Sequence, residues 1–108
     1  MGNVLGLKTS KDAVLEIYEL YAEKHACMAK AMLEDIAKAK NNDAIYKLSE
    51  CWETINYIDS QIEEKLTRLD EEGKTLLAYK VRHALPLSSI SPSRFLQILA
   101  VCGVQYDD

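Results

Sequence analysis

Two stretches of the chain carry apolar residues at the spacing of threes and fours that is typical of amphipathic helices. The first stretch predicts a helix over about 11–40, and the second predicts a helix between Asp43 and Gly73. The polar residues Asn41 and Asn42 separate them, together with Asp43, which we expect to cap the second helix. Because so short a connection favours antiparallel neighbours, we expect the two helices to form a hairpin.

The apolar residues of this hairpin are arranged almost symmetrically about Asn42. Pairing positions whose numbers sum to about 84 places apolar residues opposite one another. The predicted pairs are Leu15 with Leu69, Tyr18 with Leu66, Ala22 with Ile62, Ala29 with Ile55, Met32 with Trp52 and Ile36 with Leu48. A narrower stripe on the first helix lies to one side of these pairs and consists of Ile17, Leu20, Cys27 and Ala31. We expect this narrower stripe to need a partner other than the second helix.

Two shorter helices are predicted after the hairpin. Thr9 or Ser10 is expected to cap the first long helix, and Gly73 is expected to end the second, because glycine adopts the left-handed conformation without steric cost. The third helix then runs from about 75 to 85 and stops at Pro86, which lacks a backbone N–H. Ser91 before a proline is a typical N-cap, so a last helix is expected over about 92–102.

The last predicted helix is dense in apolar residues, with only Gln97 interrupting the run from Phe95 to Cys102. Such a helix cannot leave one side in water. It either covers the open side of the hairpin at Ile17 and Leu20 or packs against a second copy of the chain. Helices about 45 Å long exceed what a compact domain of this size needs, so we expect a homodimer through the last helix and the stripe of Ile17 and Leu20.

The predicted fold class is all-α, a long antiparallel helical hairpin closed by two shorter helices in the manner of a four-helix bundle. Residues 1–9 read as a flexible lead-in and residues 10–108 as a single helical domain. The composition, 48% apolar and 28% charged, is that of a soluble globular protein. The chain contains no apolar run long enough to span a membrane and no basic-then-apolar leader, so we expect it in the cytoplasm.

Charge is distributed unevenly along the chain. Residues 43–73 carry nine acids and three bases, a net charge of −6, whereas residues 74–108 carry four bases and two acids. This balance argues against binding to nucleic acid, which needs clustered Lys and Arg. It is compatible with a basic protein partner, or simply with a solvated helix face.

One polar pair interrupts the apolar register of the hairpin, with His25 opposite Asp59. Each side chain would be costly to bury alone, whereas together they can form a charge-assisted hydrogen bond. One hypothesis is a buried polar pair that fixes the helix register. Another is a pH-sensitive latch. A third is a ligand pocket between the long helices, lined by Tyr18, Tyr21, His25, Met28 and Trp52.

Neither metal binding, nor a cofactor, nor catalysis is predicted. Carboxylate-bridged metal sites in helical bundles use Glu-x-x-His motifs, but Ala22 and Lys80 stand three residues before His25 and His83. Cys27 lies two positions from His25, which on a helix turns the two side chains about 200° apart. The three cysteines are widely spaced and odd in number, which favours small buried side chains over a disulfide framework or a zinc knuckle.

The outer face of the second helix mixes aromatic side chains with carboxylates, and tyrosine is favoured at binding hot spots. The candidate partner-binding residues are Tyr46, Glu50, Glu53, Tyr57 and Glu64. With the other chemistry excluded, we predict a small acidic, non-enzymatic interaction protein that occupies a partner's surface. An adaptor, an immunity factor or an inhibitor of the kind that phages and mobile elements encode would act in this way. The alternative is a ligand- or signal-binding bundle that uses the pocket named above.

The first eight residues, from Met1 and Gly2 to Lys8, resemble N-myristoylated termini and those of membrane-remodelling helical hairpins of the ESCRT-III type. The resemblance implies an N-acylated, membrane-associated hairpin. It departs from the acylation motif at Gly6, where Ser or Thr is usual, and it lacks that family's strongly basic first helix. A single acyl chain without a basic patch binds membranes only marginally.

Overall fold

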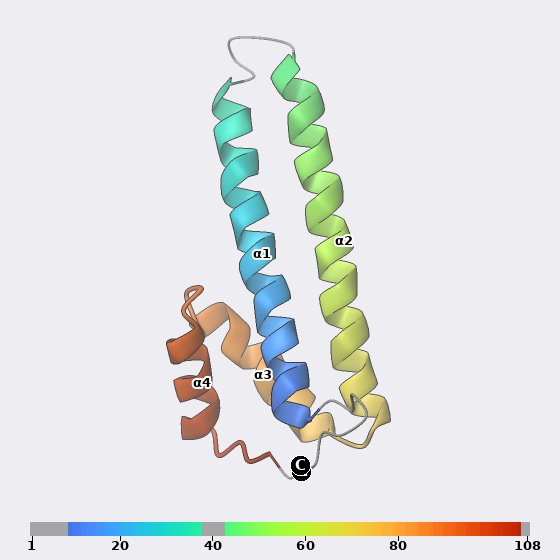
Figure 1. The fold of residues 1–108 in the computed structure, drawn as a ribbon, viewed down its shortest axis with the longest axis vertical. Helices are drawn as coiled ribbons and strands as arrows, with labels where there is room; N and C mark the ends of the chain where they lie inside the picture. Colours follow the sequence, from blue (N-terminus) through green and yellow to red (C-terminus); the bar gives the residue numbers. More distant parts are fainter. Residues whose placement is uncertain (1–8, 38–42, 107–108) are drawn as a thin grey trace.

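The computed structural model describes the backbone of residues 9–37 and 43–106, and the side chains of residues 9–33 and 50–106. The helices in these ranges are α1 (Ser10–Ala37), α2 (Asp43–Glu71), α3 (Thr75–Leu87) and α4 (Pro92–Val101). The long helices α1 and α2 run side by side in opposite directions, and α3 and α4 lie beside their lower part (Figure 1). The expected all-α fold, a long hairpin closed by two shorter helices, is confirmed.

Helix α1 begins with a reciprocal cap. The Asp12 N–H donates to Thr9 Oγ1 at 3.1 Å, and the Thr9 N–H donates to Asp12 Oδ2 at 3.3 Å. Two backbone donors that the helix itself cannot pair are therefore paired by side chains, as in a capping box. The prediction that Thr9 or Ser10 caps this helix is confirmed for Thr9.

Glycines end α2 and α4 in the same way. Gly73 has φ +82° and Gly103 has φ +81°, the left-handed conformation that side-chain-bearing residues rarely adopt. After α2, the Gly73 N–H donates to the Asp70 carbonyl at 3.0 Å and the Lys74 N–H donates to the Leu69 carbonyl at 2.8 Å. This bonding pattern is a Schellman motif, and it turns the chain from α2 into α3.

Helix α3 continues past the predicted stop and contains Pro86 in its last turn. A proline has no N–H to donate to the preceding turn, but so near the end of the helix few hydrogen bonds remain to be disturbed. The end of the helix is instead formed by Ser88, whose N–H and Oγ both donate to the Leu85 carbonyl, at 3.1 and 2.7 Å. The prediction that the helix stops at Pro86 is therefore wrong by about half a turn, and Leu87 becomes a helical residue.

The connection from α3 to α4 is short and tightly bonded. Ser89 and Ile90 have φ values of 51° and 62°, and the Ser91 N–H donates back to the Ser88 carbonyl at 3.0 Å. Ser91 Oγ then accepts from the Arg94 N–H at 3.3 Å, with Pro92 in the first turn of α4. The predicted N-cap of the last helix is confirmed.

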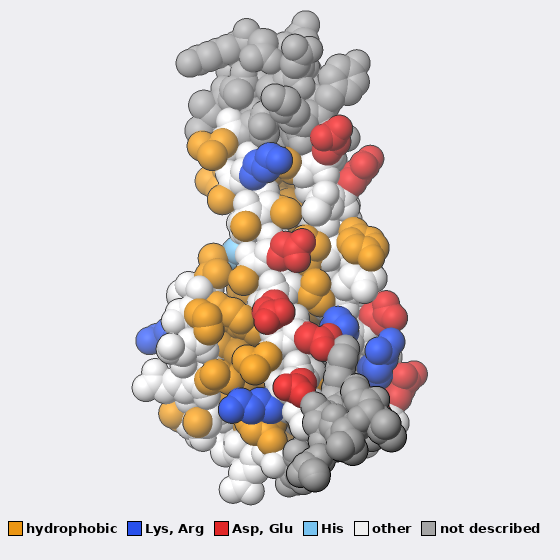
Figure 2. All heavy atoms as spheres, in the orientation of Figure 1, with side chains coloured by type: hydrophobic (Ala, Val, Ile, Leu, Met, Phe, Trp, Pro, Cys, Tyr) orange, Lys and Arg blue, Asp and Glu red, His pale blue; other side chains and the backbone are white. Residues whose placement is uncertain are grey.

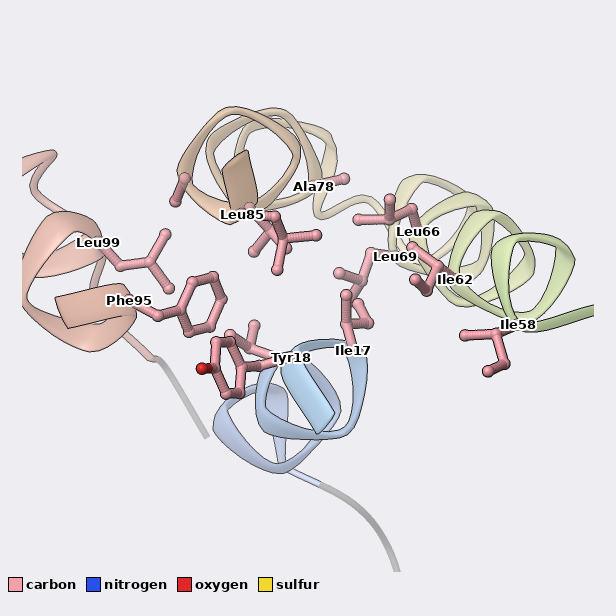
Figure 3. Packing of buried hydrophobic residues seen from close by; sticks show 13 residues of the cluster. Ile17, Tyr18, Ile58, Ile62, Leu66, Leu69, Ala78, Leu85, Phe95 and Leu99 are labelled. Carbon is pink, nitrogen blue, oxygen red and sulfur yellow. The ribbon is translucent and has the colours of Figure 1, made fainter. Parts of the chain in front are cut away.

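The main core lies at the lower end of the hairpin, where side chains from all four helices meet (Figure 3). Phe95 of α4 is fully buried, and its ring stacks on the ring of Tyr18 of α1 with the centroids 5.0 Å apart. The buried apolar residues of this cluster are Val14, Ile17, Tyr18, Ile58, Ile62, Leu66, Leu69, Ala78, Val81, Ala84, Leu85, Phe95 and Leu99. The helix α4 thus covers the open side of the hairpin, the first of the two arrangements predicted for it.

The surface expected for a homodimer is largely filled within one chain. Ile17 and Phe95 are fully buried, and Leu20 packs against the same core. Ile17 and Phe95 are therefore not available to a second copy, whereas α4 still exposes Val101 at 82%. Homodimerisation itself stays a prediction.

The structure also corrects which stripe of α1 faces α2. In the upper part of the hairpin, Ala31 is buried with Cys51 and Ile55 of α2, and Cys27 packs against the same small cluster. Cys27 and Ala31 of the narrower stripe therefore pack on α2, contrary to prediction, whereas Ile17 and Leu20 belong to the main core. Tyr18, assigned to the broader stripe and paired with Leu66, stacks on α4 instead. The spacing of apolar residues indicated that α1 is buried on a wide part of its circumference. It did not decide which of the other helices covers each part.

The hairpin register is close to the predicted one. Ion pairs join Glu16 to Lys65 at 3.0 Å and Lys24 to Asp59 at 2.8 Å. The residue numbers of these pairs sum to 81 and 83, against the predicted sum of about 84. The radius of gyration is 16.8 Å, larger than the roughly 13 Å of a compact domain of this length, because the upper halves of α1 and α2 extend beyond the other helices (Figure 1).

Candidate functional site

The predicted pair of His25 and Asp59 is not formed. Asp59 Oδ1 lies 2.8 Å from Lys24 Nζ, and the Asp59 side chain is 48% exposed. The His25 ring lies against the Tyr21 ring instead, with centroids 4.4 Å apart and the planes tilted by 58°. The long side chain of Lys24 therefore reaches across to α2 and binds the carboxylate that we expected His25 to bind. Asp59 is therefore neither buried nor partnered by a histidine.

The residues predicted to line a pocket between the long helices do not gather around one cavity. Tyr18 is buried against Phe95 of α4, whereas Trp52 is 50% exposed on α2. Tyr21 is half-buried beside His25. Three cavities of the described residues are lined by other side chains. Met32, expected opposite Trp52 in the core, is 69% exposed, so that predicted packing pair is also wrong.

Tyr18 carries an unusual hydroxyl. It is buried, and among the described residues it has no hydrogen-bond partner. Burial raises the pKa of the Tyr18 phenol, and the neighbouring Tyr21 raises it further. Because Tyr18 belongs to the main core, its unpaired hydroxyl affects the stability of the fold.

The carboxylates and the tyrosine predicted as a partner surface on α2 do share one face. Glu50, Glu53, Tyr57 and Glu64 are all exposed and recur at spacings of three, four and seven, so they project from one side of the helix. We call these four residues the acidic face of α2. Figure 2 shows acidic side chains along the α2 edge of the molecule, with hydrophobic ones exposed between them. The side chain of Tyr46 lies outside the described residues.

Within the acidic face, the carboxylates differ in their partners. Glu64 pairs with Arg68 one turn along α2, at 3.3 Å, and both side chains are 58% exposed. No ion pair joins Glu50 or Glu53 to another residue of the described ranges. Tyr57, which lies between the paired and the unpaired carboxylates, is 65% exposed.

A second exposed surface was missed in the sequence. Leu76, Tyr79, His83 and Leu87 recur at spacings of three and four along α3 and are all exposed. We call these four residues the outer stripe of α3. The Tyr79 and His83 rings lie 4.3 Å apart. The pattern was present in the sequence, but ending the helix at Pro86 removed Leu87 and left the stripe incomplete.

A cavity lies beside the start of α3, between the first residue of α1 and the residues that follow α4. Its volume is about 340 Å³, and it is lined by Ser10, Gly73, Lys74, Leu76, Leu77, Lys80, Gly103, Val104 and Gln105. Two lysines border it, but Lys74 Nζ donates to Ser10 Oγ at 2.6 Å and Lys80 Nζ donates to the Cys102 carbonyl at 2.7 Å. Both ammonium groups are engaged in tying the lower end of the molecule together.

The described residues contain no cluster of three or more His, Cys, Asp or Glu side chains that could hold a metal ion. Cys51 is buried and Cys27 is half-buried, in line with the prediction, but Cys102 is exposed at the end of α4. In the part of the chain that the structure covers, no helix has the length and apolarity needed to cross a bilayer. Gly2, the residue that the resemblance to acylated termini concerns, lies outside the described residues.

Comparison of the chain with known protein families, with curated proteins and with solved structures finds no match. The arguments for function therefore rest on the two exposed surfaces, the acidic face of α2 and the outer stripe of α3.

Proposed function

We propose that this protein is a non-enzymatic interaction module that binds a basic partner protein through the acidic face of α2. The observation that carries the proposal is the arrangement around Tyr57. A 65% exposed aromatic ring has two carboxylates, Glu50 and Glu53, on the same side of the helix without ion-pair partners in the described ranges. Exposed charges beside an exposed aromatic ring give a partner both attraction and an anchor.

The tyrosine and the carboxylates of the acidic face would contribute to binding in different ways. Tyr57 offers a large contact area with little conformational entropy to lose, which is why tyrosine is enriched among interface hot spots. The carboxylates steer an oppositely charged surface toward it and set the dependence of binding on salt. The net charge of −6 over residues 43–73 extends this field along α2. An adaptor, an immunity factor or an inhibitor would act by such occupation of a partner surface.

The test is quantitative affinity capture from cell extract on the immobilised chain, with mass spectrometry of the retained proteins. We expect a basic protein that is retained by the wild type and lost with Tyr57→Ala and with Glu53→Lys. Its retention should fall as the salt concentration rises, because the attraction is between solvent-exposed charges.

Tyr79→Ala on α3 is the matched control. It removes a tyrosine of similar exposure, 59% against 65%, from a different surface, and it should leave the captured protein in place. If no protein depends on both Tyr57 and Glu53, or if the same proteins are lost with Tyr79→Ala, the proposal that the acidic face binds a partner is wrong.

A further inference from the structure

Helix α3 is apolar on two opposite sides. One side buries Ala78, Val81, Ala84 and Leu85 in the main core. The other side carries the outer stripe, in which Leu76 is 65% exposed, Tyr79 59% and Leu87 60%. A helix at the surface of a single chain normally has one apolar side, and a helix that is apolar all round is normally covered all round. The outer stripe therefore indicates burial against something outside the chain.

The exposed apolar area of this surface is about half of what one subunit brings to a standard interface. Ile90, in the turn that follows α3, is a further exposed apolar side chain, at 47%. At about 200 Å² for a fully exposed large side chain, Leu76, Tyr79, Leu87 and Ile90 expose roughly 450 Å². Apolar patches of about 300–600 Å² are the largest found on typical monomers and are often functional. A standard interface takes about 800 Å² from each partner, of which this stripe would be the apolar centre.

We propose that the outer stripe of α3 is covered by a second copy of this chain, with the two α3 helices antiparallel across a two-fold axis. The order of residues along the stripe supports this occupant, because it reads nearly the same in both directions. Leucines stand at its two ends, Leu76 and Leu87, and the two rings of Tyr79 and His83 stand between them. In a two-fold interface each residue meets its counterpart reciprocally.

The antiparallel register follows from this order. Leu76 meets the partner's Leu87, and Tyr79 meets the partner's His83. The leucines then close the two ends of the contact, and four rings from two chains stack at its centre, where the stabilisation by aromatic pairs adds to the burial of area. In a parallel arrangement, each of the four residues would instead meet the same residue of the partner. The α4 helices of the two chains would then follow at the same end of the contact.

Charges beside the stripe fit a second copy better than a lipid surface. Arg82 Nη1 lies 2.7 Å from both carboxylate oxygens of Glu63, and Lys80 Nζ donates to the Cys102 carbonyl of its own chain. Arg94 Nε of α4 likewise donates to the Leu87 carbonyl, at 3.4 Å, so these three cations are bonded within the chain. Binding to an anionic membrane surface needs a cluster of several Lys or Arg side chains, whereas a two-fold contact needs these charges held away from its centre.

The test is the oligomeric state of the purified chain, measured by sedimentation velocity over a range of concentrations. We expect the wild type to dimerise, and Tyr79→Glu to raise the dissociation constant by roughly 100-fold or more, because both copies carry the change and charged groups in an apolar centre are costly. The Tyr79 side chain is exposed in the monomer, so circular dichroism and the melting temperature of the variant check that the chain still folds.

Tyr57→Glu is the matched control, a similarly exposed tyrosine changed in the same way on α2, and the dimer should persist. A wild type that stays monomeric at millimolar concentration overturns the proposal. So does a dimer that survives Tyr79→Glu, and so does a monomer that sediments with anionic vesicles through the same residues. The measurement uses the chain alone, so its failure leaves the proposed binding through the acidic face of α2 untouched.

Cross-linking tests the antiparallel register. In a Cys102→Ser background, the single variants Tyr79→Cys and His83→Cys are mixed and treated with a mild oxidant. Because position 79 of one chain meets position 83 of the other, we expect disulfides mainly between the two different variants. Equal or greater cross-linking of each variant with itself would overturn the antiparallel arrangement.

Discussion

The lower and upper halves of the hairpin are built from the same two helices but are stabilised very differently. At the lower end, thirteen buried apolar residues from four helices form one core. In the upper arm, the buried cluster among the described side chains has three members, Ala31, Cys51 and Ile55. Two helices pressed together can bury only the stripe between them, whereas four helices enclose a volume. The difference therefore reflects how many elements surround each half, rather than the apolar content of α1 and α2.

The two halves also differ in how much apolar surface they expose. Large apolar side chains such as Met32, Leu33 and Trp52 are exposed in the upper arm, at 69%, 69% and 50%. The same arc of α1 is buried lower down, where Val14 and Tyr18 contact the main core. Stability should therefore reside at the lower end, and the arm should open at a lower free energy than the whole molecule.

The largest expected effect is at the lower end. Phe95→Ala removes a fully buried ring that stacks on Tyr18 and leaves a cavity in the middle of the main core. We expect a loss of about 3–5 kcal/mol in the free energy of unfolding, which is a large part of the stability of a domain of this size. Urea unfolding followed by circular dichroism measures it. A loss below about 1 kcal/mol would mean that α4 is not an integral part of the core.

A smaller effect is expected from the matching change in the arm. Ile55→Ala also removes a buried side chain, 3% exposed, but from a cluster with few neighbours that can close up around the change. We expect about 2 kcal/mol, the lower end of the range for such substitutions. Native-state hydrogen exchange should show faster exchange in the upper half of α2 and unchanged exchange in α3. Equal losses for Ile55→Ala and Phe95→Ala would contradict the division into a strong and a weak half.

The difference between the halves was only partly predictable from sequence. The hairpin, a cap at Thr9 or Ser10 and the end of α2 at Gly73 were predicted because each depends on a few neighbouring residues. The assignment of stripes on α1 failed because apolar residues cover so wide an arc that periodicity fits either face. Which part of that arc is buried depends on α3 and α4, which are distant in sequence.

The candidate surfaces were also predictable only where a few neighbouring residues decide the structure. The acidic face of α2 was predicted because exposed charges at helical spacing need no knowledge of the rest of the fold. The pairing of His25 with Asp59 failed because a change of one position in register exchanges His25 for Lys24. The outer stripe of α3 was missed because a proline in the last turn of a helix was taken as its end.

The next substitution is expected to raise the free energy of unfolding rather than lower it. Tyr18→Phe removes a buried hydroxyl that has no hydrogen-bond partner among the described residues while keeping the ring stacked on Phe95. Burying an unpaired hydroxyl costs about 1–3 kcal/mol, so we expect the variant to be more stable by about 1 kcal/mol at pH 7. Unfolding experiments on both proteins measure the difference. A loss of stability would show that the hydroxyl has a partner in solution, such as a bound water.

The same variant has a distinct dependence on pH. The pKa of Tyr18 is raised in the folded state by burial and by Tyr21, so the folded protein holds the phenolic proton more tightly than the unfolded chain does. This contribution to stability is complete below the ordinary tyrosine pKa of 10.0 and is lost as the pH rises above it. Tyr18→Phe should therefore lose less stability than the wild type between pH 9 and about 11. Tyr106, whose pKa is also raised by burial, contributes in the same direction in both proteins, so Tyr106→Phe is the control.

The smallest effect is expected where the two halves join, at the ion pair of Lys24 and Asp59. The pair is short, at 2.8 Å, but the Asp59 side chain is 48% exposed, so water already screens it. We expect a coupling energy of about 0.5 kcal/mol in a double-mutant cycle with Lys24→Met and Asp59→Asn. The cycle of His25→Gln with Asp59→Asn is the control, and its coupling should be near zero because the ring of His25 lies on Tyr21. A larger coupling for His25 than for Lys24 would restore the register predicted from sequence, and it would rotate the upper half of α1 relative to α2.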